Sequence, residues 1–95
     1  MKEKFNEWMR KSKPRITRPD KYSNTITTIS NHFRKSIGKD INLYEIHNIR
    51  ELITLKDEYF SYDKFYSRNK IGNNMYSRSL DLYIEFLESK YRVNE

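Results

Sequence analysis

The densest group of side chains that could act chemically is a run of positive charge near the N-terminus. Six cations and a single acid, Asp20, fall within twelve residues. Lysine and arginine neutralise nucleic-acid phosphates, and the counterions that they release make such binding depend steeply on salt. A solvated charged loop is the alternative interpretation. The six candidate phosphate-binding residues are Arg10, Lys11, Lys13, Arg15, Arg18 and Lys21.

Short hydrogen-bonding side chains recur along the predicted helix that follows this run. They are spaced by four, three and four residues, so they share one face, opposite the apolar face of that helix. Asparagine and threonine can bond base edges or phosphates in a groove, and lysine adds charge. An ordinary polar surface remains the alternative. The four candidate residues are Asn24, Thr28, Asn31 and Lys35.

A second basic cluster surrounds the last predicted turn of the chain. Free backbone N–H groups at the start of the helix after this turn would add anion-binding capacity. If this helix lies beside the second helix, both basic regions face one partner. The candidate DNA contacts in this cluster are Arg68, Lys70 and Arg78.

Aromatic residues are dense just before that turn. Such rings could stack on unpaired bases, but their mixed spacing across a helix junction favours packing in and around the core. The residues are Tyr59, Phe60, Tyr62, Phe65 and Tyr66.

No set of residues has the spacing of a catalytic or metal site. His32 and His47 are the only histidines and cysteine is absent, so we predict no metal ion and no cofactor. His47 and Arg50 match the letters His-x-x-Arg of tyrosine recombinases, but that chemistry also needs a second arginine, a lysine and a nucleophilic tyrosine arranged by a separate domain larger than this chain. Pro19-Asp20 with Glu88-Ser89-Lys90 matches a restriction-nuclease pattern, yet predicted helices stand where that pattern needs strands. We therefore expect no enzyme activity.

The apolar spacing predicts an all-α fold, a compact bundle of four or five helices around one core. Pro19 and Gly38 are typical of the two ends of the second helix, and Asn48 with Glu51 resembles a capping box. We expect a packed loop over 40–47, with a short extended segment as the alternative, and a turn over 69–74. The predicted helices span residues 3–12, 19–37, 48–60 and 74–91, with a further helical turn over 61–68.

The charge is distributed unevenly along the 95 residues. Residues 1–39 carry eleven basic and three acidic side chains, a net charge of +8, whereas the whole chain carries +6. This asymmetry indicates an anionic partner. The chain has no cysteine for disulfides and no apolar run near the roughly 20 residues that span a bilayer. We expect a single helical domain over residues 1–95, located in the cytoplasm and not bound to a membrane.

The C-terminal half carries a more specific pattern, Gly72-Asn73-Asn74-Met75-Tyr76-Ser77-x-x-Leu80-x-x-Tyr83-x-x-Phe86-Leu87, preceded by Leu43-Tyr44-Glu45-Ile46. This pattern resembles the N-terminal helical DNA-binding modules of some bacterial restriction endonucleases, including methylation-dependent ones. The overall plan is also similar to the SAM-like core-binding domain of tyrosine recombinases, a helical DNA clamp. The resemblance covers residues 5–88 and implies a nuclease or ATPase domain or subunit as a further partner.

Together these features favour a non-catalytic module that binds double-stranded DNA, as the accessory or specificity domain of a bacterial restriction or recombination system. The alternative is a small phage or mobile-element inhibitor or adaptor that binds a protein partner through its basic face. A third hypothesis makes the chain the non-catalytic part of a larger nuclease or recombinase.

Overall fold

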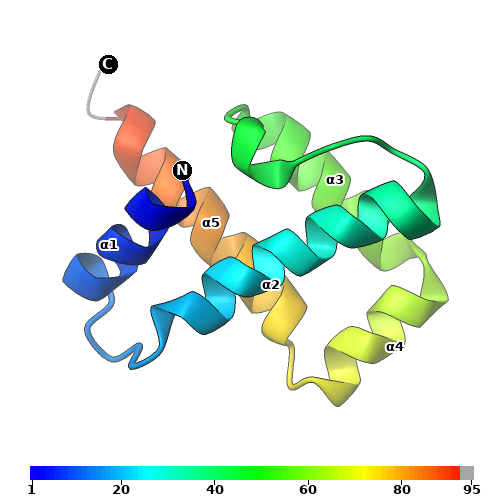
Figure 1. The fold of residues 1–95 in the computed structure, drawn as a ribbon, viewed down its shortest axis with the longest axis horizontal. Helices are drawn as coiled ribbons and strands as arrows, with labels where there is room; N and C mark the ends of the chain where they lie inside the picture. The colour runs from blue at the N-terminus through cyan, green and yellow to red at the C-terminus, as the bar shows by residue number, and fades with distance from the viewer. Residues whose placement is uncertain (93–95) are drawn as a thin grey trace.

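Five α-helices pack around one core in a computed structural model that describes residues 1–92 (Figure 1). In that range there is no strand, so the predicted all-α bundle is confirmed. Helix α2 crosses α5 and contacts it more extensively than any other helix does, while α1 lies on one side of this pair and α3 and α4 on the other. The helices are α1 (Lys2–Ser12), α2 (Pro19–His32), α3 (Ile49–Ser61), α4 (Asp63–Ile71) and α5 (Met75–Arg92).

The ends of α2 follow the predicted signals. Pro19 occupies the start of the helix, where its missing N–H costs no hydrogen bond. After His32 the chain continues as a π-helical turn, Phe33–Ile37, and ends at Gly38. Gly38 has φ 85°, and the next N–H, from Lys39, donates to the carbonyl of Phe33 at 2.9 Å. The predicted helix over 19–37 is therefore continuous, with a wider last turn.

The start of α3 is capped as the sequence predicts. The Asn48 side chain accepts a hydrogen bond from the backbone N–H of Glu51 at 3.0 Å, which satisfies one N–H that has no partner inside the helix.

The predicted turn over 69–74 is too long, because α4 continues to Ile71 and only three residues, 72–74, form the turn. Gly72 has a negative φ, whereas Asn73 and Asn74 have φ 55° and 63°. Asparagine tolerates this left-handed region better than most residues do. The reversal therefore depends on the asparagine pair rather than on the glycine.

The packed loop over 40–47 is held to the core through Leu43, which begins a short 3₁₀ turn, Leu43–Glu45. Its N–H donates to the buried hydroxyl of Ser30 at 3.0 Å, and its carbonyl accepts from the Tyr83 hydroxyl at 3.2 Å. Both backbone groups of this buried residue are thus satisfied, as burial requires.

The core forms where the apolar faces of all five helices meet. Rings pack in two groups: Phe5 lies 5.3 Å from Tyr83 and 5.5 Å from Phe86, and Tyr59 stacks on Phe65 at 4.5 Å. Burying each large side chain stabilises the fold by roughly 1.5–3 kcal/mol. The most completely buried apolar residues are Phe5, Met9, Ile26, Ile29, Phe33, Leu43, Leu52, Tyr59, Phe65, Tyr83 and Leu87.

Candidate nucleic-acid interface

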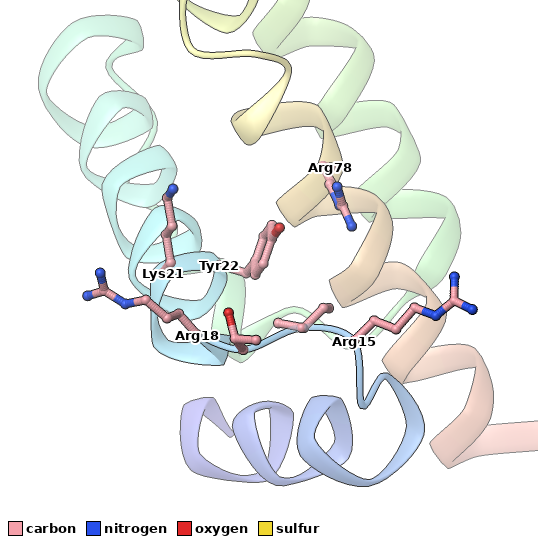
Figure 2. A pocket seen from close by; sticks show the side chains of 7 residues that line it. Arg15, Arg18, Lys21, Tyr22 and Arg78 are labelled. Carbon is pink, nitrogen blue, oxygen red and sulfur yellow. The ribbon is translucent and has the colours of Figure 1, made fainter.

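A surface hollow of about 210 Å³ lies where the loop after α1, the start of α2 and the first half of α5 meet (Figure 2). Four cations from these three segments line it, and none of the described residues in its lining is acidic. We call it the four-cation hollow. Its lining residues are Arg15, Ile16, Thr17, Arg18, Lys21, Tyr22 and Arg78.

Local packing of the loop explains how the first of these cations reach the surface. Ile16 is half-buried against the core, and its N–H donates to the Lys13 carbonyl at 2.9 Å. Lys13 is itself fixed by an ion pair with Glu85 of α5 at 2.7 Å and by a position 6.0 Å from the centre of the Trp8 ring. With the loop anchored at these points, the neighbouring Arg15 is exposed.

Arg78 joins the hollow from α5. Its guanidinium carbon lies 5.5 Å from the centre of the Tyr22 ring, a cation–π contact between α5 and α2. In Figure 2 the Tyr22 ring lies within the hollow near Arg78, whereas Arg15 and Arg18 extend to opposite sides. The positive charges therefore surround the hollow rather than converge on one point.

Little of this charge is neutralised inside the molecule. Arg18 lies 4.0 Å from Asp20, and both side chains are more than half exposed, so this pair is weak. Among the described residues, no acidic side chain lies within ion-pair distance of Arg15, Lys21 or Arg78. The hollow is thus suited to an anionic ligand.

Two other predicted cations, Arg10 and Lys11, are exposed in the last turn of α1. They lie on the helix that leads into the loop and do not line the hollow. The sixth cation of the predicted run, Lys13, is half-buried in its ion pair and lines a neighbouring hollow.

The predicted polar face of α2 is partly occupied by internal hydrogen bonds. The Thr28 hydroxyl donates to the Asn24 carbonyl at 3.2 Å, and the Asn31 side-chain oxygen accepts from Arg34. The side chains of Asn24 and Lys35 are exposed. Two of the four predicted groups thus already have a partner within the helix.

The structure divides the second predicted cluster. Arg78 belongs to the four-cation hollow, whereas Arg68 donates to His32 Nε2 at 3.0 Å and Lys70 lies 4.6 Å from the centre of the Tyr66 ring. The expected adjacency of α2 and α5 is present. It brings Arg78 to the first basic group without bringing Arg68 and Lys70 with it.

His32 is held by ring stacking and two hydrogen bonds. Its ring stacks 4.8 Å from Phe65, and Nδ1 lies 2.7 Å from the Tyr59 hydroxyl. Because arginine only donates, Nε2 must accept from Arg68, so the ring is neutral with its proton on Nδ1. Burial, Arg68 and then Lys64 lower the pKa of His32, and burial raises the pKa of Tyr59.

The aromatic residues near the last turn separate into buried and exposed ones. Tyr59 and Phe65 are in the core and Phe60 is half-buried, as the packing interpretation predicts. Tyr62 and Tyr66 are 41% and 49% exposed, so these two rings alone of the five remain open to stacking on a ligand.

Sequence reasoning missed the part that Tyr22 plays in the hollow. Its spacing of four residues before Ile26 predicts a place on the packing face of α2, whereas its half-buried ring also contacts Arg78. No local signal links these two residues, because they come together only through the crossing of α2 and α5.

The residues that the structure describes contain no cluster of three or more histidine, aspartate or glutamate side chains that could hold a metal ion. Within the same range, no helix has both the length and the apolar character needed to cross a membrane. No protein-family model matches the sequence, and no curated protein or solved structure matches the chain.

Proposed function

We propose that this domain binds double-stranded DNA without catalysing a reaction on it, and that the four-cation hollow contacts the phosphate backbone. One observation carries the proposal: Arg15, Arg18, Lys21 and Arg78 come from three segments and surround one hollow. Solubility alone does not favour this arrangement, because cations that are gathered around one hollow repel one another.

The arrangement of the charges favours a polymer over a single small anion. Arg15 and Arg18 extend to opposite sides of the hollow (Figure 2), and a DNA duplex offers a row of phosphates, one charge per about 1.7 Å of its axis. The exposed Arg10 and Lys11 of α1 extend the positive surface beyond the hollow.

The salt dependence of binding tests this proposal. Four phosphate contacts give a slope of about −3.6 for log affinity against log salt, or roughly a hundredfold loss between about 50 and 200 mM salt. The measurement is fluorescence anisotropy of a labelled duplex at several salt concentrations. If no binding is seen at the lowest salt, the proposal is wrong.

A pair of charge-matched variants separates the hollow from net charge. We expect the double variant Arg15→Ala with Arg78→Ala to bind more weakly and to reduce the slope by about 1.8. The control, Lys4→Ala with Arg50→Ala, removes the same charge from exposed positions outside the hollow. Equal losses in the two variants would mean that binding depends on net charge alone.

We further propose that the domain serves as the accessory or specificity part of a bacterial restriction or recombination system in the cytoplasm. The support is the resemblance carried by the string from Gly72 to Leu87. In that string Leu80, Tyr83 and Leu87 are core residues, so the resemblance concerns the fold more than the contacts. Co-purification with a nuclease or ATPase subunit would test this assignment.

A protein partner is the second candidate. Ile71, at the end of α4, is 84% exposed, which is unusual for a large apolar side chain. An inhibitor or adaptor could combine this side chain with the basic surface to bind an acidic protein. A stoichiometric protein complex, lost in Ile71→Ser and formed without DNA, would favour this function.

A further inference from the structure

A second hollow of about 360 Å³ adjoins the four-cation hollow. The two share Arg15, Ile16 and Arg78 in their linings, so they meet at these side chains. Its volume is within the range of about 300–1,000 Å³ that is usual for small-molecule sites. Its lining residues are Ser12, Lys13, Pro14, Arg15, Ile16, Arg78 and Leu82.

The two hollows differ in chemistry. Pro14, Ile16 and Leu82 give the second hollow apolar surfaces, and its one additional cation, Lys13, is already paired with Glu85. The positive charge not engaged in ion pairs belongs to the shared residues and to the four-cation hollow. An apolar space therefore lies directly beside a cationic one.

From this juxtaposition we propose that the second hollow receives the base of an unpaired nucleotide while the four-cation hollow holds the adjoining phosphate. The inference rests on the proposed DNA binding and specifies which form of DNA is preferred. A nucleotide has the same division, with a flat, weakly polar base next to a charged phosphate. Arginine suits the position between them, because its guanidinium donates to phosphates and its flat face stacks on bases.

The lining predicts little selectivity among bases. Reading a base edge needs donors and acceptors that converge on it, and among the described residues of the lining Ser12 is the only uncharged side chain with a hydrogen-bonding group. Stacking is tolerant of sequence, since every base has a flat face. We therefore expect all four bases to bind within a few-fold of one another.

The preferred DNA is one in which a base is already free. Taking a base out of a paired duplex costs stacking and pairing energy, and this cost is least where the base is unpaired. An overhang or a bulge should therefore bind more tightly than the same duplex with blunt ends.

Three duplexes of the same core sequence test the inference by competition. One has blunt ends, one carries a single-nucleotide overhang, and one carries an abasic overhang that keeps the additional phosphate but lacks the base. We expect the base-containing overhang to bind about tenfold more tightly than the abasic one. Equal affinities for these two would overturn the inference while leaving duplex binding intact. Failure of all three duplexes to bind would overturn the proposed function as well.

A neutral substitution locates the base. Pro14 is exposed in the loop, so Pro14→Gln changes an apolar wall of the second hollow without changing charge. We expect this variant to lose most of the preference for the base-containing overhang and to bind the blunt duplex as before. The matched control is Tyr66→Gln, which removes an exposed ring on α4 and should retain the preference. The opposite pattern would place the base on α4 and overturn the inference.

Discussion

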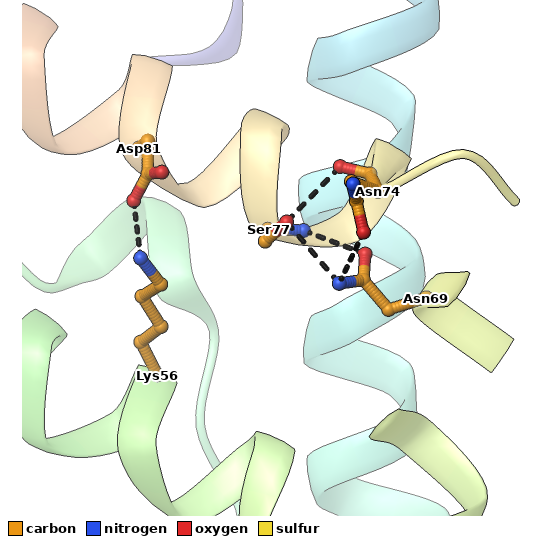
Figure 3. A network of polar contacts seen from close by, with 5 residues as sticks. All are labelled: Lys56, Asn69, Asn74, Ser77 and Asp81. Atoms are coloured by element: carbon orange, nitrogen blue, oxygen red, sulfur yellow. Dashed lines mark hydrogen bonds and ion pairs between the residues drawn. The ribbon is translucent and has the colours of Figure 1, made fainter. Parts of the chain in front are cut away.

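Replacing Asn69 by alanine should loosen the junction between α4 and α5. Asn69 is only 9% exposed, and its side chain contacts the start of α5 (Figure 3). Its oxygen accepts from the Ser77 backbone N–H at 3.0 Å, and its nitrogen donates to the Ser77 hydroxyl at 3.2 Å. The same nitrogen makes a longer hydrogen bond, of 3.5 Å, to the side-chain oxygen of Asn74. Ser77 is the third residue of α5, so its N–H has no partner inside that helix. Asn69 thus caps one helix from another.

The size of the effect follows from these contacts. The two shorter hydrogen bonds contribute about 1 kcal/mol each, and alanine regains roughly 0.5 kcal/mol because it is the better helix former. We expect Asn69→Ala to lower the free energy of unfolding by about 1.5 kcal/mol. For a domain of this size, that corresponds to a fall in Tm of about 6–12 °C.

Urea and thermal unfolding followed by far-ultraviolet circular dichroism would measure this loss. Asn69→Asp keeps the oxygen that accepts from Ser77 but removes the donor, so it should be less destabilising than Asn69→Ala. The control, Ser67→Ala, changes an exposed side chain on the same helix and should stay within about 0.5 kcal/mol of the wild type. The reasoning is refuted if Asn69→Ala is as stable as this control.

Three further substitutions test other contacts. Because burial and neighbouring cations lower the pKa of His32, the unfolded chain binds its proton more tightly than the folded chain does. The free energy of unfolding should therefore be highest above pH 6.5, the pKa of this histidine in the unfolded chain, and should decrease as the pH falls through the lower pKa of the folded chain. Urea titrations over this pH range should show a smaller decrease for His32→Gln than for the wild type. Gly38→Ala meets no atom within 4 Å but keeps φ 85°, so it should cost about 1–2 kcal/mol in urea unfolding from backbone conformation alone. Ser30→Ala removes the acceptor of the buried Leu43 N–H and should cost about 1–3 kcal/mol, whereas the exposed Ser36→Ala should not change the urea midpoint.

The helices could be predicted because their signals are local. The spacing of Ile26, Ile29 and Phe33 marks the buried face of α2 within two turns, and the Asn48 cap is set by a residue three positions away. Asn69 misled the prediction of the turn: its polarity is typical of a loop, but hydrogen bonds to α5 offset the cost of burying it.

The candidate site was less predictable than the fold. Arg15, Arg18 and Lys21 stand close together in the sequence, and their shared surface could be expected. Arg78 reaches the same hollow only because α2 crosses α5, and the ion pair that engages Lys13 with Glu85 also depends on the folded arrangement. A count of charges cannot distinguish a cation that is available from one that is already paired.

The pairing of α1 with α5 also bears on how the chain folds during its synthesis. The ring of Phe5 packs on Tyr83 and Phe86, which belong to α5, the last of the described helices. When α1 leaves the ribosome, its main aromatic partners have not yet been translated. The part of α1 that packs on α5 therefore stays uncovered until α5 emerges, although α1 can already contact α2, which is translated earlier. We expect the domain to reach its folded state late in translation rather than helix by helix.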